Sequence, residues 1–78
     1  MRLTPVNKAE HKYLLTVPNR GKDVLTVKIF NEAQSLVYRN RETVAGDFAK
    51  VYDLSELKGK VTFEVWDKKG KNNRLSVQ

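Results

Sequence analysis

Apolar and polar residues alternate along much of this chain with a period of two, which is the spacing of side chains on one face of a β-strand. The clearest case is residues 60–67, where Val61, Phe63 and Val65 share one face. Residues 11–17 alternate in the same way. Each segment is therefore predicted to be a strand with one face against a core.

Strand-like segments recur along the chain with turn residues between them, as in all-β domains. Residues 2–6 are expected to form an edge strand, because Pro5 has no N–H to donate to a neighbouring strand. Residues 23–30 are apolar enough on both faces to form a central strand. The other predicted strands are residues 35–41, 48–54 and 74–78.

The segments between these strands carry turn signals. PNRGK, residues 18–22, is predicted to be a hairpin loop, because its proline ends pairing and its glycine accepts positive φ. NEAQ, residues 31–34, has no glycine and favours a loop around a type I turn. Gly46 marks a turn or a crossing between sheets. A polar loop and a second hairpin tip are predicted at residues 7–10 and 67–73.

The strand that begins at Phe48 departs from strict alternation. Phe48, Val51 and Leu54 are all apolar and recur at every third position. A β-bulge near Ala49 and Lys50 is predicted to bring this spacing onto one buried face.

A single helical turn is predicted at DLSELK, directly after this strand. Asp53 followed by Glu56 has the form of a capping box, in which each side chain binds a backbone N–H of the first turn. Leu54 and Leu57 then point inward, and Gly59 supplies the left-handed residue that ends the turn. We interpret this corner as a crossover from one sheet to the other.

Length and strand number together indicate the fold class. A chain of 78 residues without cysteine is expected to form a single domain, residues 1–78, held by packing and backbone pairing. About seven short strands with a crossover in the middle favour an all-β, immunoglobulin-like antiparallel β-sandwich over a five-stranded barrel.

A series of motifs also points to a known family. The series comprises an extended segment ending in VY, the corner DLSEL.G and the alternating strand after it. Through these motifs, residues 24–71 resemble the small Ig-like β-sandwich domains of secreted and periplasmic bacterial proteins, including C-terminal sorting domains of a gliding-associated secretion system. The resemblance implies a non-catalytic accessory or attachment domain in the periplasm, on the cell surface or secreted. The motif residues are Val27, Ile29, Val37, Tyr38, Asp53, Leu54, Ser55, Leu57, Gly59, Phe63 and Val65.

The net charge of +6 and a pI near 9.8 would attract an anionic partner. Trp66 faces away from the predicted core positions, next to a basic stretch. The candidate binding surface is therefore Trp66, Lys68, Lys69, Lys71 and Arg74. For the lysines we favour the simpler role of preventing sheets from pairing with one another, and for Trp66 we favour cover by the N-terminal strand or a lysine stem.

Residue types for chemistry are sparse. His11 has no second imidazole to share a metal with, and capping accounts for Asp53 and Glu56. No nucleophile elbow, phosphate-binding glycine loop or thiol is present. We therefore predict no enzyme activity, no cofactor and no catalytic or metal-ligating residue.

Two functional hypotheses follow. The first is an interaction or attachment domain of an exported protein, with a protein partner or a cell-surface component. The second is a basic OB-like barrel that binds single-stranded nucleic acid, which we consider the weaker because acidic residues are dispersed through the chain. No apolar run approaches the ~18 residues of a membrane span. Residues 1–5 are not a signal peptide, so any targeting segment would have been removed.

Overall fold

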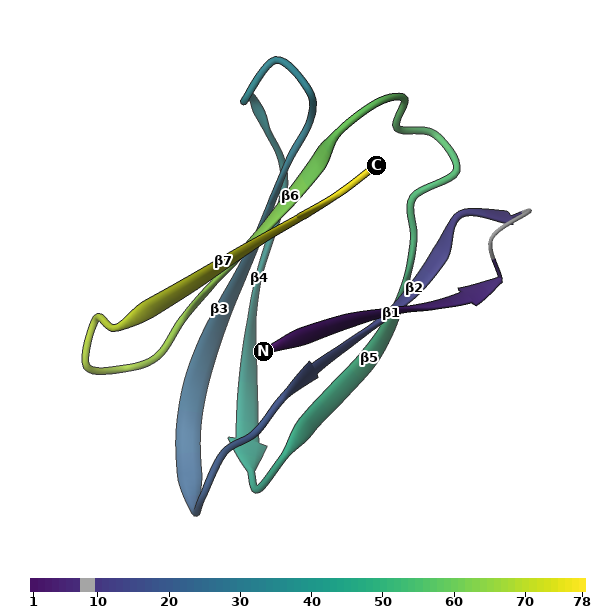
Figure 1. Ribbon diagram of the computed structural model, residues 1–78. Helices are drawn as coiled ribbons and strands as arrows, with labels where there is room; N and C mark the ends of the chain where they lie inside the picture. The colour runs from purple at the N-terminus through teal and green to yellow at the C-terminus, as the bar shows by residue number, and fades with distance from the viewer. Residues whose placement is uncertain (8–9) are drawn as a thin grey trace.

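The computed structural model describes residues 1–7 and 10–78, which form two antiparallel sheets that face each other (Figure 1). The smaller sheet has the order β1-β2-β5, and its strands are Arg2–Asn7, Lys12–Val17 and Phe48–Asp53 respectively. The larger sheet has the order β4-β3-β6-β7, and its strands are Leu36–Ala45, Lys22–Phe30, Val61–Trp66 and Asn72–Val77. The predicted all-β sandwich of seven strands is confirmed.

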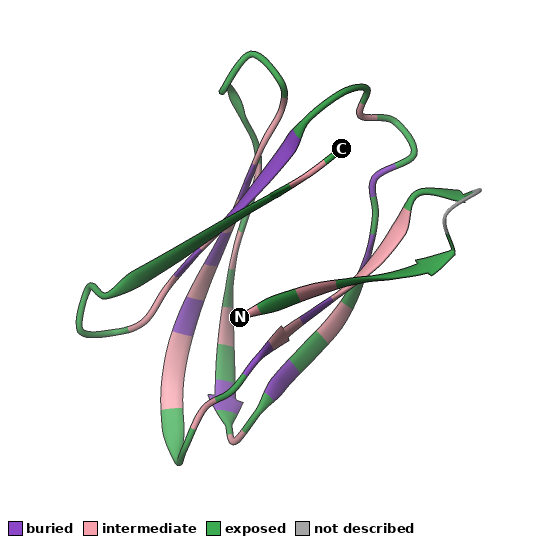
Figure 2. Cartoon of the chain, viewed as in Figure 1, coloured by how far each residue is buried: buried purple, intermediate pink, exposed green. Residues whose placement is uncertain are grey.

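The core lies between the two sheets and is built from the inward side chains of both (Figure 2). Phe63, Leu15 and Val27 have no exposed surface. Val61 and Val65 are each 3% exposed, which confirms the predicted core face of residues 60–67. In Figure 2 buried segments lie on β2, β3, β4, β5 and β6, whereas β7 is exposed along most of its length. The larger sheet therefore extends beyond the cover of the smaller one.

The predicted positions of two strands are confirmed. β1 lies at the edge of the smaller sheet, where Pro5 pairs in register with Tyr13. β3 lies between β4 and β6 and is central in the larger sheet. The predicted polar loop at residues 7–10 lies partly outside the described residues.

The predicted hairpin at residues 18–22 is wrong. β2 and β3 belong to different sheets, so this segment crosses from the smaller sheet to the larger one. Gly21 does take positive φ, at 68°. Turn residues show where the chain changes direction, but the choice of pairing partners depends on residues far along the sequence.

The first hairpin of the larger sheet agrees with its prediction. Gln34 donates its backbone N–H to the carbonyl of Asn31 at 2.9 Å, which closes a turn whose central residues avoid positive φ. That arrangement is compatible with the predicted type I turn. β4 then continues past residue 41 to Ala45, and Gly46 takes the chain across to the smaller sheet.

The predicted β-bulge in β5 is also wrong. β5 pairs with β2 in unbroken register, and its buried positions Phe48 and Tyr52 follow the ordinary period of two. Val51 is 49% exposed, while Lys50 takes the inward position. An inward lysine is tolerated here because its ammonium lies 3.2 Å from Glu42 Oε2 and its side chain remains 41% exposed.

The corner after β5 is a β-turn rather than a helical turn. Asp53 Oδ1 accepts the N–H of Ser55 at 2.9 Å, and Leu57 donates its N–H to the carbonyl of Leu54 at 2.9 Å. The predicted capping box with Glu56 is therefore wrong, because the Asp53 carboxylate already accepts a hydrogen bond from Ser55, two residues along the chain. Leu54 is 3% exposed, and the corner crosses from the smaller to the larger sheet as predicted.

Asn19 joins two of the crossings between the sheets. Its backbone N–H donates to Asp47 Oδ1 at 2.9 Å, and its Nδ2 donates to the carbonyls of Gly21 and Gly46 at 3.0 and 3.2 Å. Since the two carbonyls lose a donor in Asn19→Ala, we expect the free energy of unfolding to fall by about 1–2 kcal/mol. Urea unfolding would measure this change.

A matched control for Asn19→Ala is Asn72→Ala. Asn72 lies on exposed β7, and no side-chain hydrogen bond joins it to the residues the structure describes. Its replacement is expected to change stability by less than about 0.5 kcal/mol. Equal effects at the two positions would contradict the bridging role of Asn19.

Candidate functional site

A row of charged side chains crosses all four strands of the larger sheet. Arg39 on β4 pairs in register with Lys28 on β3, and Lys28 pairs with Glu64 on β6. Glu64 in turn pairs with Arg74 on β7. The residues that alternate with this row on β3 and β6 are buried, so the row points away from the core.

A second row lies beside the first on the same side of the sheet. Arg41 pairs with Thr26, and Thr26 pairs with Trp66. We call the resulting surface the outer basic face, and its residues are Lys28, Phe30, Arg39, Arg41, Glu64, Trp66 and Arg74. It carries four cations against one carboxylate, so its net charge is +3.

The two aromatic rings of this face are covered by cations. Lys28 Nζ lies 5.2 Å from the centroid of the Trp66 ring, and the Arg74 guanidinium lies 5.5 Å from that of Phe30. The indole N–H of Trp66 also donates to Glu64. Cation–π attraction holds the basic groups over the rings, which leaves the face charged rather than apolar.

The predicted binding residues divide into two groups. Trp66 and Arg74 belong to the outer basic face. Trp66 is partly buried, with the Lys28 ammonium over its ring, and β1 lies in the other sheet. Lys68, Lys69 and Lys71 lie instead in the turn between β6 and β7.

That turn is ordered by two aspartate side chains that accept its backbone N–H groups. Asp67 Oδ1 accepts the backbone N–H groups of Lys69 and Lys71, each at 2.9 Å. Lys68 donates its N–H to Asp23 Oδ1 at 3.1 Å and its ammonium to the carbonyl of Lys22 at 3.3 Å. The turn is thereby tied to the start of β3, at the side of the sheet rather than across its face.

Sequence reasoning missed three cations of the outer basic face. Lys28, Arg39 and Arg41 lie far from the late basic stretch that attracted attention. The alternation of residues 23–30 already placed Lys28 on the face opposite Leu25, Val27 and Ile29. What the sequence lacked was the strand order, which brings β4 and β7 to the two edges of one sheet.

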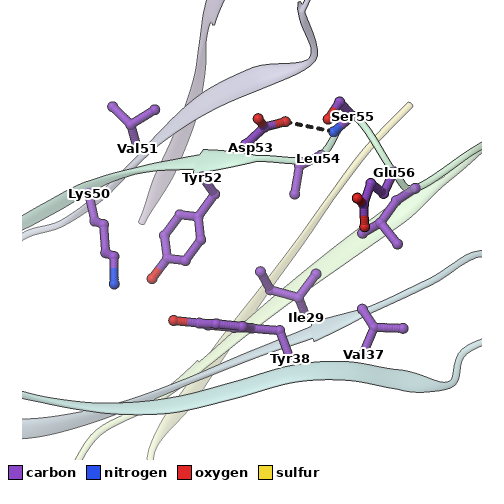
Figure 3. A pocket seen from close by; sticks show the side chains of 11 residues that line it. Ile29, Val37, Tyr38, Lys50, Val51, Tyr52, Asp53, Leu54, Ser55 and Glu56 are labelled. Carbon is purple, nitrogen blue, oxygen red and sulfur yellow. Dashed lines mark hydrogen bonds between the residues drawn. The ribbon is translucent and has the colours of Figure 1, made fainter.

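A separate pocket opens between β4, β5 and the corner that follows β5, and we call it the corner pocket (Figure 3). Its volume is about 640 Å³. In Figure 3 Tyr38 and Tyr52 point toward one another from the two strands, and their ring centroids lie 5.8 Å apart at 78°. Lys50 Nζ lies 5.5 Å from the centroid of the Tyr52 ring.

The polar groups in this pocket have shifted acidities. Tyr52 is 7% exposed, and its hydroxyl has no hydrogen-bond partner among the described residues. Burial raises the pKa of the Tyr52 phenol above its ordinary value. The pKa of Lys50 is also raised, chiefly by its hydrogen bond to Glu42. Both groups therefore keep their protons at neutral pH.

The remaining candidates for chemistry lie apart. In residues 1–7 and 10–78, no three His, Cys, Asp or Glu side chains gather where they could hold a metal ion. His11 is exposed and takes positive φ at 54°, and its carbonyl accepts the N–H of Leu54 at 2.9 Å. The described part of the chain also contains no helix with the length and apolar character needed to cross a membrane.

Comparisons of the chain with protein-family models, with curated proteins and with solved structures gave no match.

Proposed function

We propose that this chain is a non-catalytic interaction domain of an exported bacterial protein and that it binds an anionic partner through the outer basic face. The observation that carries this proposal is the row Arg39, Lys28, Glu64 and Arg74, which brings three cations across four strands. A surface with one sign of charge speeds encounter with a partner of the opposite sign and suppresses other partners.

The order of the strands supports an immunoglobulin-like domain. Three strands in the order β1-β2-β5 face four in the order β4-β3-β6-β7, and the chain crosses between sheets after β2, β4 and β5. Antiparallel sandwiches with such crossings are common in extracellular binding domains. Location outside the cytoplasm and attachment to a surface or a protein partner follow from the resemblance described above and form part of the proposal.

Nucleic-acid binding is less well supported. The chain forms two separate sheets instead of the five-stranded barrel of an OB-fold. Single-stranded nucleic acid is usually held by bases stacked on open aromatic rings. Here Lys28 covers Trp66 and Arg74 covers Phe30, so the rings offer little free surface for stacking.

Binding to polyanions in solution tests the proposal. Calorimetric titrations would use polyglutamate, dextran sulfate and a single-stranded DNA oligonucleotide, each at low and at high salt. We expect Arg39→Gln/Arg41→Gln to weaken binding by about tenfold, because both arginines are exposed on the face. Affinity should also fall as salt rises.

The control variant is Lys58→Gln/Lys60→Gln, which removes the same charge from the exposed corner between β5 and β6. It is expected to change affinity by less than about twofold. An equal loss in both variants would show attraction to net charge alone, and the proposal would fail. DNA bound far more tightly than the other polyanions would favour the nucleic-acid hypothesis instead.

A further inference from the structure

We propose that the corner pocket binds a neutral, hydroxyl-bearing ring such as one sugar unit of a glycan. This site is separate from the outer basic face, because Tyr38, Lys50 and Tyr52 point between the two sheets. Its volume of about 640 Å³ falls within the ~300–1,000 Å³ of small-molecule sites. The inference does not depend on the function proposed above.

The Tyr52 hydroxyl offers a ligand a hydrogen-bonding group that no atom of the described residues uses. The tyrosine is 7% exposed, and no described residue hydrogen bonds its hydroxyl. A buried polar atom without a partner is costly and rare in native proteins. The side chain lines the corner pocket, so an oxygen of a bound molecule would supply the absent partner.

The lining offers both apolar surface and hydrogen-bonding groups. Ile29, Leu54 and Leu57 form an apolar wall. Lys50 and Tyr52 at the other end are donors. A ring with C–H groups on one side and hydroxyls around its edge matches a pocket with an apolar wall and hydrogen-bond donors at the other end.

The charges around the pocket favour a neutral ligand. Asp53 and Glu56 lie at its rim and Lys50 within it, and Lys50 is already paired with Glu42 at 3.2 Å. A carboxylate ligand would therefore meet more negative than positive charge. An ammonium ligand would be repelled by the Lys50 ammonium and could not accept its protons. Hydroxyl groups both donate and accept, so they suit the carboxylates and the donors together.

Access to the Tyr52 hydroxyl depends on Lys50. The Lys50 ammonium lies 5.5 Å from the centroid of the Tyr52 ring, and its side chain is 41% exposed. A ligand reaches the hydroxyl when this flexible side chain moves aside within the pocket, where its ammonium still donates to the ligand. In Figure 3 both side chains hang from β5 on the same side, facing Tyr38 on β4.

Amide chemical shifts in the ¹⁵N-labelled protein test the inference directly. Glucose, galactose and N-acetylglucosamine would be titrated separately, with benzoate and benzylamine as charged comparisons. We expect at least one sugar to shift the amides of Leu54, Ser55 and Leu57 in a saturable way. Neither charged compound should saturate at a lower concentration than that sugar.

Variants inside and outside the corner pocket show whether the sugar binds at this site. Tyr52→Phe keeps the ring and removes the hydroxyl, so it should weaken sugar binding by about fivefold or more. Lys50→Met, a second variant, should also weaken it because a donor is lost. Tyr13→Phe removes a hydroxyl from β2, outside this pocket, and should leave the affinity unchanged.

Four results would overturn the inference. They are the absence of saturable shifts with every sugar, shifts confined to β7 and the outer basic face, tighter binding of benzoate or benzylamine, and an unchanged affinity in Tyr52→Phe. The polyanion titrations test residues of the outer basic face, which lie outside the corner pocket. Failure of sugar binding would therefore leave the proposed function standing, and failure of polyanion binding would leave the sugar site standing.

Discussion

Replacement of Leu54 by alanine is expected to lower the free energy of unfolding by about 2–5 kcal/mol. Leu54 is 3% exposed and lies where the chain leaves β5 and crosses to the larger sheet. Alanine would remove buried surface and leave a cavity between the sheets. A domain of 78 residues has a total stability of roughly 4–12 kcal/mol, so the loss is a large part of it. Urea unfolding followed by tryptophan fluorescence would measure the change.

The matched control is Val51→Ala, on the strand that leads into the corner. Val51 is 49% exposed and points away from the core. Its replacement is expected to cost no more than about 1 kcal/mol. If Val51→Ala were the more damaging change, the inward face of β5 would be Phe48, Val51 and Leu54, and the observed arrangement of the two layers would be wrong.

Stability is expected to fall as the pH rises above about 10, because of Tyr52. Burial holds the pKa of this phenol above the ordinary value of 10.0 in the folded protein. At a pH between the pKa of the unfolded chain and that of the folded protein, the Tyr52 phenol has lost its proton in the unfolded chain and still holds it in the folded protein. The contribution of Tyr52 is therefore complete below pH 10 and is lost as pH rises toward the folded pKa, at up to ~1.4 kcal/mol per pH unit.

Tyr52→Phe isolates this contribution, since every other ionisable group is the same in the two proteins. At neutral pH the variant should be about 1 kcal/mol more stable, because the buried hydroxyl without a partner is gone. Above pH 10 the gap should widen as the wild-type protein loses stability faster. Parallel stability curves for the two proteins between pH 9 and 12, measured by urea unfolding, would refute the raised pKa.

The corner after β5 shows how far local sequence reasoning reaches. DLSEL followed by glycine predicted a crossover with two inward leucines, and Leu54 is buried with Leu57 packed against the core. The same residues predicted a capping box between Asp53 and Glu56, which does not form. The aspartate instead accepts the N–H of Ser55, because a contact two residues away is satisfied in any tight turn and requires no helix.

The candidate sites were only partly foreseeable. Trp66 was identified because it faces away from the predicted core positions, and Arg74 because it belongs to the late basic stretch. Lys28 and Arg39 join them only through pairing of β3 with β4 and β6. The corner pocket could not be predicted, since it needs Tyr38 and Tyr52 to face each other from different sheets.

The sequence alone determined the number and approximate positions of the strands, the face of β6 that is buried and the position of β1 at an edge. These features depend on residues close together, through alternation and through the missing N–H of Pro5. Only the tertiary structure decided that residues 18–22 cross between sheets, that Lys50 and not Val51 points inward, and that four cations lie on one face. The physical reason is that strand pairing is set by contacts between distant segments, which compete with local preference and here override it.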